Sequence, residues 1–249
     1  MLKEERFKKI LDVLNDKEFI TAKELAKTLF VSIPTIRRDL TELEQRELLI
    51  RSHGGAIKVS STNTVAPIKF RKTLNSKIKK QLSTLALSLI KENDIIFIDA
   101  STSALQIAHS LPNNYKITVI TNSILINSVL TKKNITSYCT GGVLQLNSMC
   151  YAGNFAEKFL ETFNFDIMFF SSYGVNDKLF IVDTSLPETL LRQVAISKSK
   201  KTAFLCDSSK FFQSASYNLL PLIDVDYILT DSKSISKKLK KYKGKVLTI

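Results

Sequence analysis

The sequence has few of the residues that build covalent or metal-based scaffolds. Its 249 residues include only three cysteines and two histidines. Cys139, Cys150 and Cys206 are widely spaced, with no Cys-x-x-Cys pair. Disulfide frameworks and structural zinc sites need closely spaced ligands of these types. The sequence therefore predicts neither a disulfide framework nor a metal site, and it fits a reducing cytoplasm.

Long apolar runs are also missing. No segment approaches the roughly 18 apolar residues that indicate a membrane helix. The first residues form a charged amphipathic stretch rather than the apolar region of a signal peptide. We therefore expect a cytoplasmic protein with no membrane partner. The length of 249 residues is enough for a small domain and a larger one.

Positive charge is in excess, with 36 Lys and Arg against 23 Asp and Glu and a net charge of +13. Such a balance favours an anionic partner. Residues 1–60, however, hold 12 basic residues against 10 acidic ones. Much of the excess lies in residues 69–80 and 233–245, and a lysine-rich tail is ordinarily a solvated surface. Net charge alone therefore does not locate a nucleic-acid site.

Residues 31–40 have the pattern of the recognition helix of a helix-turn-helix. Ser32 can cap the helix by accepting a bond from an unpaired backbone N–H. Pro34 falls in the first turn, where a missing N–H costs nothing. Apolar residues recur at i, i+4 and i+7 and predict a buried face: Ile36, Leu40 and Leu43. Asp39 lies beside this face, so we expect it to hold the fold rather than to read bases.

The other faces of this helix carry side chains suited to DNA. At 3.6 residues per turn, Pro34, Arg38 and Thr41 point away from the buried face, and Thr35 and Arg37 lie on its flanks. An arginine can bond a guanine edge bidentately, or bond a phosphate. The alternative is a capped surface helix with two solvated arginines, and this stretch alone does not decide between the two.

The segments around this helix complete a winged helix. An amphipathic helix begins the chain, and the capping box opened by Thr21 predicts a second helix. Residues 48–52 and 56–59 predict two strands, joined through residues whose glycines supply positive φ angles. Three helices and a hairpin form a winged helix, whose wing can lie along DNA. The wing residues that we expect to contact DNA are Arg51, His53, Gly54 and Gly55.

The rest of the chain alternates strand and helix patterns. Residues 1–58 are the predicted DNA-binding domain, residues 59–73 a polar linker, and residues 74–249 a second domain. Its expected strands are residues 95–98, 117–120, 135–140, 166–170, 202–206, 227–230 and 246–249. Helices between them, one at residues 186–199, predict an α/β domain whose mainly parallel sheet is covered on both faces.

Ordered motifs run through nearly the whole chain. Those of the first part are Glu24-Leu-Ala, Val31-Ser, Thr35-Ile-Arg-Arg-Asp-Leu40 and His53-Gly-Gly-Ala56. Those of the second part are Arg71, Lys77, Asp99-Ala-Ser-Thr, Thr121-Asn122, Gly141-Gly142, Gly153, Asp207-Ser-Ser-Lys210 and Thr230-Asp231. Together they resemble the DeoR family of bacterial transcription regulators. The resemblance implies a DNA-binding module joined to a sensor domain related to sugar-phosphate isomerases. It also implies a dimer or tetramer that represses sugar or nucleoside metabolism until a phosphorylated metabolite releases it.

Small and polar residues cluster where the expected strands end. Ligands of open α/β sheets bind outside the carboxyl ends of the strands, and a helix N-terminus with hydroxyls and a lysine suits a phosphate. The expected effector-binding residues are Asp99, Ser101, Thr102, Ser103, Thr121, Asn122, Gly141, Gly142, Ser172, Gly174, Asp207 and Lys210, with Arg192 added if its helix faces the crevice. In any one loop such residues can simply form turns and caps. Five strand ends together favour a ligand crevice.

The chain departs from the family pattern in this second domain. Ser101 occupies the usual glycine of an Asp-x-Gly-Thr-Thr motif, and Ser103 replaces its last threonine. Arg192 stands where a lysine is more usual, and residues 179–180 lack the typical glycine. The Cβ of a serine can crowd a close approach of backbone to phosphate. These changes affect the effector site and leave the DNA-binding module untouched.

Three classes of function fit these observations. The favoured one is a regulator without cofactor or catalytic residues, whose partners are operator DNA, a phosphorylated sugar and further copies of itself. The second is a sugar-phosphate isomerase or lyase with an accessory DNA-binding module, in which Asp99, Glu188, Asp207 and Lys210 can serve as acid or base. The third is a winged helix used only for protein association.

Overall fold

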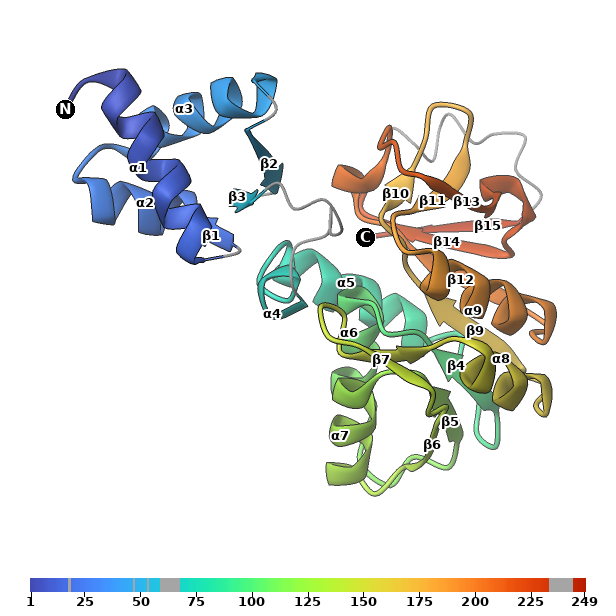
Figure 1. Ribbon diagram of the computed structural model, residues 1–249. Coiled ribbons are helices and arrows are strands. Elements are labelled where there is room, and N and C mark those ends of the chain that lie inside the picture. Colours follow the sequence, from blue (N-terminus) through green and yellow to red (C-terminus); the bar gives the residue numbers. More distant parts are fainter. Residues whose placement is uncertain (18, 47, 53, 59–67, 233–243) are drawn as a thin grey trace. The chain divides into compact units, whose positions relative to one another are not determined.

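The computed structural model describes residues 1–17, 19–46, 48–52, 54–58, 68–232 and 244–249 (Figure 1). These residues form two compact units, Met1–Leu74 and Asn75–Ile249. Three predictions fall partly or wholly outside the described residues. They are the wing residue His53, most of the linker and most of the lysine-rich tail. Within the described ranges, no helix has the length and apolar content needed to cross a membrane.

The first unit is a helical bundle beside a small antiparallel sheet, which confirms the predicted winged helix (Figure 1). Its helices are α1 (Lys3–Asp16), α2 (Ala22–Leu29), α3 (Ile33–Gln45) and the short α4 (Ile68–Arg71). Its strands are β1 (Phe19–Thr21), β2 (Leu49–Ser52) and β3 (Gly55–Lys58). β2 and β3 form the predicted hairpin, and β1 pairs with the other edge of β3. Three residues are too few to show strand alternation, so the sequence did not predict β1.

Local sequence explains how these elements begin and meet. The capping box of α2 is present, because Thr21 Oγ1 accepts a bond from Glu24 N at 3.0 Å and Thr21 N donates to the Glu24 carboxylate at 2.9 Å. The apolar faces form a single core that includes Phe7, Ile10, Leu14, Leu25, Ile36, Leu40, Leu43 and Leu49. Gly55 allows β3 to approach β1, since a Cβ there would lie 2.2 Å from Ile20 O.

A seven-stranded parallel sheet, in the order β15-β14-β12-β9-β4-β5-β6, forms the centre of the second unit. The strands are β4 (Ile95–Ile98), β5 (Thr118–Thr121), β6 (Thr136–Cys139), β9 (Ile167–Phe170), β12 (Thr202–Leu205), β14 (Tyr227–Thr230) and β15 (Lys245–Thr248). Each predicted strand agrees with one of these to within one residue at either end. The predicted parallel sheet is confirmed.

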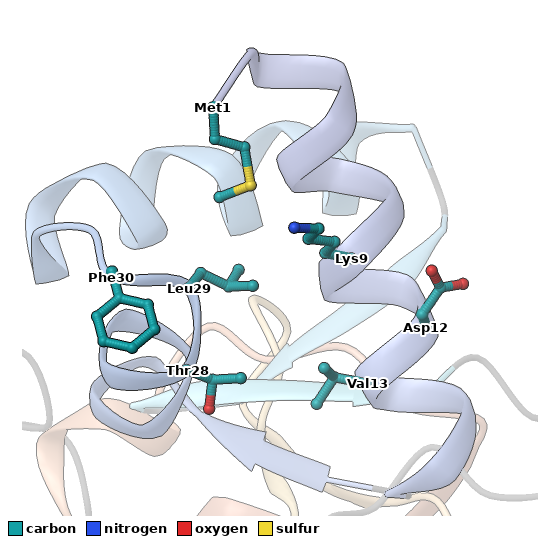
Figure 2. Close-up of a pocket in the computed structure, with 7 residues that line it drawn as sticks. All are labelled: Met1, Lys9, Asp12, Val13, Thr28, Leu29 and Phe30. Atoms are coloured by element: carbon teal, nitrogen blue, oxygen red, sulfur yellow. The ribbon is translucent and has the colours of Figure 1, made fainter.

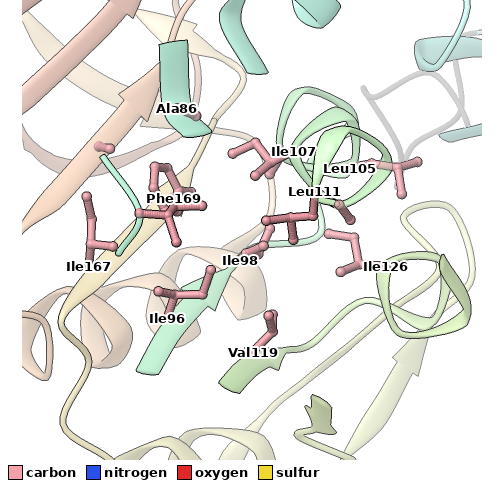
Figure 3. Packing of buried hydrophobic residues seen from close by; sticks show 14 of the residues in the cluster. Ala86, Ile96, Ile98, Leu105, Ile107, Leu111, Val119, Ile126, Ile167 and Phe169 are labelled. Carbon is pink, nitrogen blue, oxygen red and sulfur yellow. The ribbon is translucent and has the colours of Figure 1, made fainter. Parts of the chain in front are cut away.

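Helices cover both faces of this sheet. They are α5 (Ser76–Leu87), α6 (Thr102–Ser110), α7 (Ile124–Lys132), α8 (Asn154–Glu161) and α9 (Leu186–Ser197). Successive strand residues point to opposite faces, so Ile96 and Ile98 pack in one cluster with α5, α6 and α7 (Figure 3). Phe97 and Phe170 pack in a second cluster with α8 and α9.

Smaller elements lie outside the parallel sheet, and the sequence did not predict them. A second sheet is antiparallel and contains β10 (Gly174–Val175), β11 (Phe180–Asp183) and β13 (Tyr217–Pro221). A hairpin is formed by β7 (Val143–Gln145) and β8 (Cys150–Ala152). Two short 3₁₀ helices are η1 (Ser208–Lys210) and η2 (Leu222–Asp224). The hairpin and η1 follow the ends of β6 and β12, so they adjoin the predicted effector site.

Candidate nucleic-acid interface and effector site

The N-terminus of α3 is capped as the sequence predicts. Ser32 Oγ accepts a hydrogen bond from Thr35 N at 3.3 Å and lies 2.8 Å from Thr35 Oγ1. The two hydroxyls therefore bond to each other. Pro34 lies in the first turn and is exposed. This arrangement fixes where the helix begins and leaves the ring of Pro34 on its surface.

Two arginines of α3 are exposed and uncommitted. Arg37 and Arg38 form no ion pair with another described residue. In contrast, Arg6 pairs with Asp39, and Arg46 pairs with Glu42 at 2.7 Å. A guanidinium without an internal partner can bond a base or a phosphate without first breaking a contact in the protein. The free cations of this helix therefore lie on its surface, away from its core-facing residues.

Asp39 has the structural role that the sequence predicts. It is buried and accepts two hydrogen bonds from Arg6 of α1, one of them from Nη2 at 2.8 Å. The hydrogen bond that Arg6 donates to Asp39 is the largest cause that raises the pKa of Arg6, against the opposing effect of burial. The pair ties α3 to α1, and it places the acidic group of α3 in the protein interior rather than beside the two arginines.

The described part of the wing contacts α3. Arg51 Nη1 donates to Thr41 Oγ1 at 2.9 Å, and Arg51 N donates to Glu44 Oε1 at 3.1 Å. The wing arginine therefore lies next to a residue that was predicted on the DNA-facing side of α3. Gly54 is exposed with a φ of +97°, but Gly55 is buried. We correct the prediction for Gly55, because its place against β1 gives it a packing role instead of a DNA contact.

A hollow of about 490 Å³ lies elsewhere in this unit, between α1 and the end of α2 (Figure 2). Its lining residues are Met1, Lys9, Asp12, Val13, Thr28, Leu29 and Phe30. None of the residues predicted to bind DNA is among them. The hollow therefore does not form part of the candidate nucleic-acid interface.

In the second unit, Asp99 links the ends of β4 and β9. It directly follows β4, and its carboxylate accepts bonds from Ser101 N at 3.0 Å and from Ser171 N at 3.3 Å. Ser101 in turn caps α6 by accepting a bond from Ala104 N at 3.1 Å. The loop of residues 99–103, the predicted phosphate loop, is therefore held by the Asp99 carboxylate, and the Ser101 hydroxyl caps the helix that follows.

Arg192 is held by three carboxylates. Its guanidinium lies 2.9 Å from Asp99, 3.0 Å from Asp183 and 3.2 Å from Glu188. Burial disfavours the charged form, but the attraction of the three carboxylates outweighs it and raises the pKa of Arg192. Helix α9, which carries Arg192, faces the strand ends, which was the condition for an effector contact by Arg192. However, the guanidinium is committed to the protein, so we reassign Arg192 from effector contact to the joining of α9 with β4 and β11.

Two lysines lie near the predicted phosphate loop. Lys210 Nζ donates to Ser171 Oγ at 2.7 Å and also to Ser172 O. Lys79 of α5 is buried, and its Nζ donates to Thr102 Oγ1 at 3.0 Å. Sequence reasoning missed Lys79, because it counted the lysines of residues 69–80 only toward the net charge. The helical spacing of Lys79 from Leu82 and Ala86, which share its buried face, was the signal that could have found it.

The remaining predicted residues divide into two groups. Asn122 is buried, and its Oδ1 has no hydrogen-bond partner among the described residues. The others serve local structure: Thr121 donates to Ile98 O, Ser172 to Gly174 O, and Asp207 accepts from Asn75 and Ser209. Gly142 has a φ of +109° and lies close to Ala152 O. No hydrogen bond between described residues joins Gly141 or Gly142 to Asp99.

Both units match models of known protein families. The model described as the DeoR-like helix-turn-helix domain matches residues 6–62. The model described as the DeoR C terminal sensor domain matches residues 74–232. The chain belongs to the DeoR family. The family resemblance of the sequence motifs is thereby confirmed, and in this DeoR-family chain the winged helix is a DNA-binding module.

Curated relatives share this organisation over nearly their full length. The chain is 36% identical over 233 residues to the uncharacterized HTH-type transcriptional regulator YulB of Bacillus subtilis, covering 93% of this chain and 90% of that protein. It is 31% identical to the lactose phosphotransferase system repressor of Staphylococcus epidermidis, covering 96% of each. It is also 31% identical to the L-fucose operon activator of Haemophilus influenzae, covering 94% and 93%. The DeoR-family chain is thus a transcription regulator rather than an enzyme.

Proposed function

We propose that this regulator is a cytoplasmic repressor of a sugar or nucleoside operon and that a phosphorylated sugar controls it. Residues 1–58 bind operator DNA, residues 59–73 link the domains, and residues 74–249 bind the effector and join copies of the chain. The observation that carries the proposal is the pair of uncommitted arginines, Arg37 and Arg38, on the exposed side of a capped α3. The relatives' names support the sugar connection, since two of them refer to lactose and fucose systems.

In the DNA complex, α3 lies in the major groove and β2–β3 lie along the backbone. Arg37 and Arg38 contact base edges or phosphates, which are the two groups that a free guanidinium recognises. Other contacts come from Ser32, Pro34, Thr35, Thr41, Arg51, His53 and Gly54. One winged helix covers few base pairs, so we propose a homo-oligomer, a dimer or a tetramer, that reads half-sites one helical turn or a multiple apart.

The effector's phosphate binds at the N-terminus of α6, beside Ser101, Thr102 and Ser103. Backbone N–H groups at a helix N-terminus favour an anion. The ammonium of Lys79, 3.0 Å from Thr102 Oγ1, adds positive charge at the same place. Lys210, whose Nζ donates a hydrogen bond to Ser171 Oγ, supplies a second positive charge. Asn122 Oδ1 offers a buried acceptor for a hydroxyl group of the sugar.

Control by the effector requires two arrangements of the DNA-binding units. A ligand shifts such an equilibrium only if it binds one arrangement more tightly than the other. A repressor is released when the effector prefers the arrangement that does not fit the operator. An activator needs the reverse preference, and relatives with each printed role exist.

One set of experiments tests this function. Full-length protein selects duplexes from a random library, and shift assays at fixed salt measure its affinity with and without a panel of sugar phosphates. We expect one sequence class to be selected and one phosphate to lower the affinity for it. Light scattering should show a dimer or tetramer on this duplex. Failure to select any duplex would contradict DNA binding, and an unchanged affinity with every phosphate would contradict the effector.

A further inference from the structure

The first turn of α3 presents two apolar side chains to its surroundings. The hydroxyls of Ser32 and Thr35 bond to each other. Between them lie Ile33, whose exposed fraction is 37%, and the exposed Pro34. The long cationic side chains of Arg37 and Arg38 follow one turn later. The start of the helix is therefore suited to contact with an apolar group on DNA.

Thymine carries the apolar group that the major groove displays. In a helix-turn-helix, residues near the N-terminus of the recognition helix contact base edges. The base edges there offer hydrogen-bonding atoms and the C5-methyl group of thymine. We infer that Pro34 contacts a thymine methyl group in each operator half-site and so selects thymine at one position. This inference rests on the proposed DNA binding by residues 1–58.

Pro34 is better placed for this contact than its apolar neighbours. It lies on the same side of α3 as Arg38 and Thr41, away from the core-facing Ile36. Ile33 lies nearer to the core-facing side and is partly covered. Pro34 therefore lies one turn before Arg38 on the side opposite the core, whereas Ile33 lies one turn before Arg37 on the flank.

Helix geometry also places the thymine relative to a second base. Four residues separate Pro34 from Arg38, which corresponds to about 6 Å along a helix. Base pairs of DNA follow one another at about 3.4 Å. If Arg38 reads a guanine, the thymine lies within about two base pairs of it. The inference thus specifies a short sequence element and not a single base.

Phe30 is the competing apolar residue and provides a matched control. Its side chain is 94% exposed, and its φ of +54° lies in a region that side chains other than glycine rarely adopt. It precedes α3 and lies beside the hollow between α1 and α2 (Figure 2). Replacing Phe30 removes more exposed apolar surface than replacing Pro34, but it leaves the surface of α3 intact.

The experiment removes the methyl group from the DNA and the ring from the protein. Each thymine of a selected duplex is replaced in turn by deoxyuridine, which lacks only the C5-methyl group. Wild type, Pro34→Ala and Phe30→Ala are then titrated at one salt concentration. Alanine suits an early helical position, and melting curves confirm that both variants are folded.

We expect deoxyuridine at one position per half-site to weaken binding by wild type roughly three- to fivefold, the scale of one buried methyl group. Pro34→Ala should bind both duplexes equally, whereas Phe30→Ala should still discriminate. Two results would overturn the inference. In the first, wild type binds every deoxyuridine duplex as tightly as the thymine duplex. In the second, Pro34→Ala still prefers the thymine duplex as wild type does. A protein that selects no duplex at all contradicts the proposed function instead.

Discussion

Asp39 and Arg6 join the recognition helix to the first helix of the bundle. The Asp39 carboxylate is 2% exposed and accepts two hydrogen bonds from the Arg6 guanidinium, one at 2.8 Å. Asp39 follows two consecutive exposed arginines, yet it points into the protein. Three adjacent residues of α3 therefore divide into two that are available to DNA and one that fixes the helix in place.

Loss of this ion pair should destabilise the first unit. Asp39→Ala leaves Arg6 without its carboxylate in a largely buried place, and we expect the free energy of unfolding to fall by about 3 kcal/mol. Urea unfolding followed by far-UV circular dichroism measures the change. Asp12→Ala is the control, because Asp12 is an exposed residue of α1 and forms no ion pair among the described residues. Equal stability of the two variants would show that the pair does not hold α3.

The two uncommitted arginines should contribute to DNA affinity but not to the free energy of unfolding. If Arg38 reads a base edge, Arg38→Ala should cost about 1–3 kcal/mol of binding free energy and relax the preference at one position. If Arg37 contacts a phosphate, Arg37→Ala should instead weaken binding to all sequences and reduce the slope of log affinity against log salt concentration by about one. Shift assays over a range of salt concentrations measure both quantities.

A matched variant separates specific contacts from net charge. Lys8→Ala/Lys9→Ala removes two exposed positive charges from α1, the same number that Arg37→Ala/Arg38→Ala removes from α3. The arginine variant should lose specific binding, and the lysine variant should retain most of it. Equal binding by wild type and the arginine variant would remove these residues from the interface.

Arg192 should be needed for the stability of the second unit. Arg192→Met leaves Asp99, Asp183 and Glu188 buried together without a cation, and breaking such a buried pairing costs about 3–5 kcal/mol. Arg192→Lys keeps the charge, but a single ammonium group cannot bond all three carboxylates as the forked guanidinium does. The free energy of unfolding should therefore fall less in Arg192→Lys than in Arg192→Met. Urea unfolding of both variants tests this order. A stable Arg192→Met would contradict the assigned structural role.

The lysines near the phosphate loop should govern binding of the effector. A sugar phosphate that binds the folded protein raises its melting temperature by mass action. Lys79→Met keeps most of the length of the buried side chain but removes its charge, and Lys210→Ala removes the second cation. Both should abolish the shift that the phosphate produces.

Lys200→Ala is the control for this experiment, because Lys200 is exposed and pairs with Asp166 at 2.8 Å. It should respond to the phosphate as wild type does. The unphosphorylated sugar should leave all four proteins unchanged. A full thermal shift in Lys79→Met would exclude Lys79 from the phosphate site.

Local patterns in the sequence were sufficient for most of the regular structure. Ser32 and Pro34 mark the start of α3, because capping and the first turn depend only on neighbouring residues. Central strands of the parallel sheet such as β4 and β9 were predicted because strands buried on both faces are continuous apolar runs. β11 and β13 were missed, since each is specified by its pairing with a strand far along the chain.

The same distinction applies to the candidate sites. The sequence by itself placed Asp99 and Ser101 at a strand end and the two arginines on the outer face of α3, because strand order and helical period determine those positions. Only the tertiary structure decided that Arg192 is neutralised by Asp99, 93 residues away, and that Lys79 lies buried beside Thr102. Whether a charged group is free or committed depends on which distant side chains the fold brings within hydrogen-bonding distance, and no local pattern encodes that.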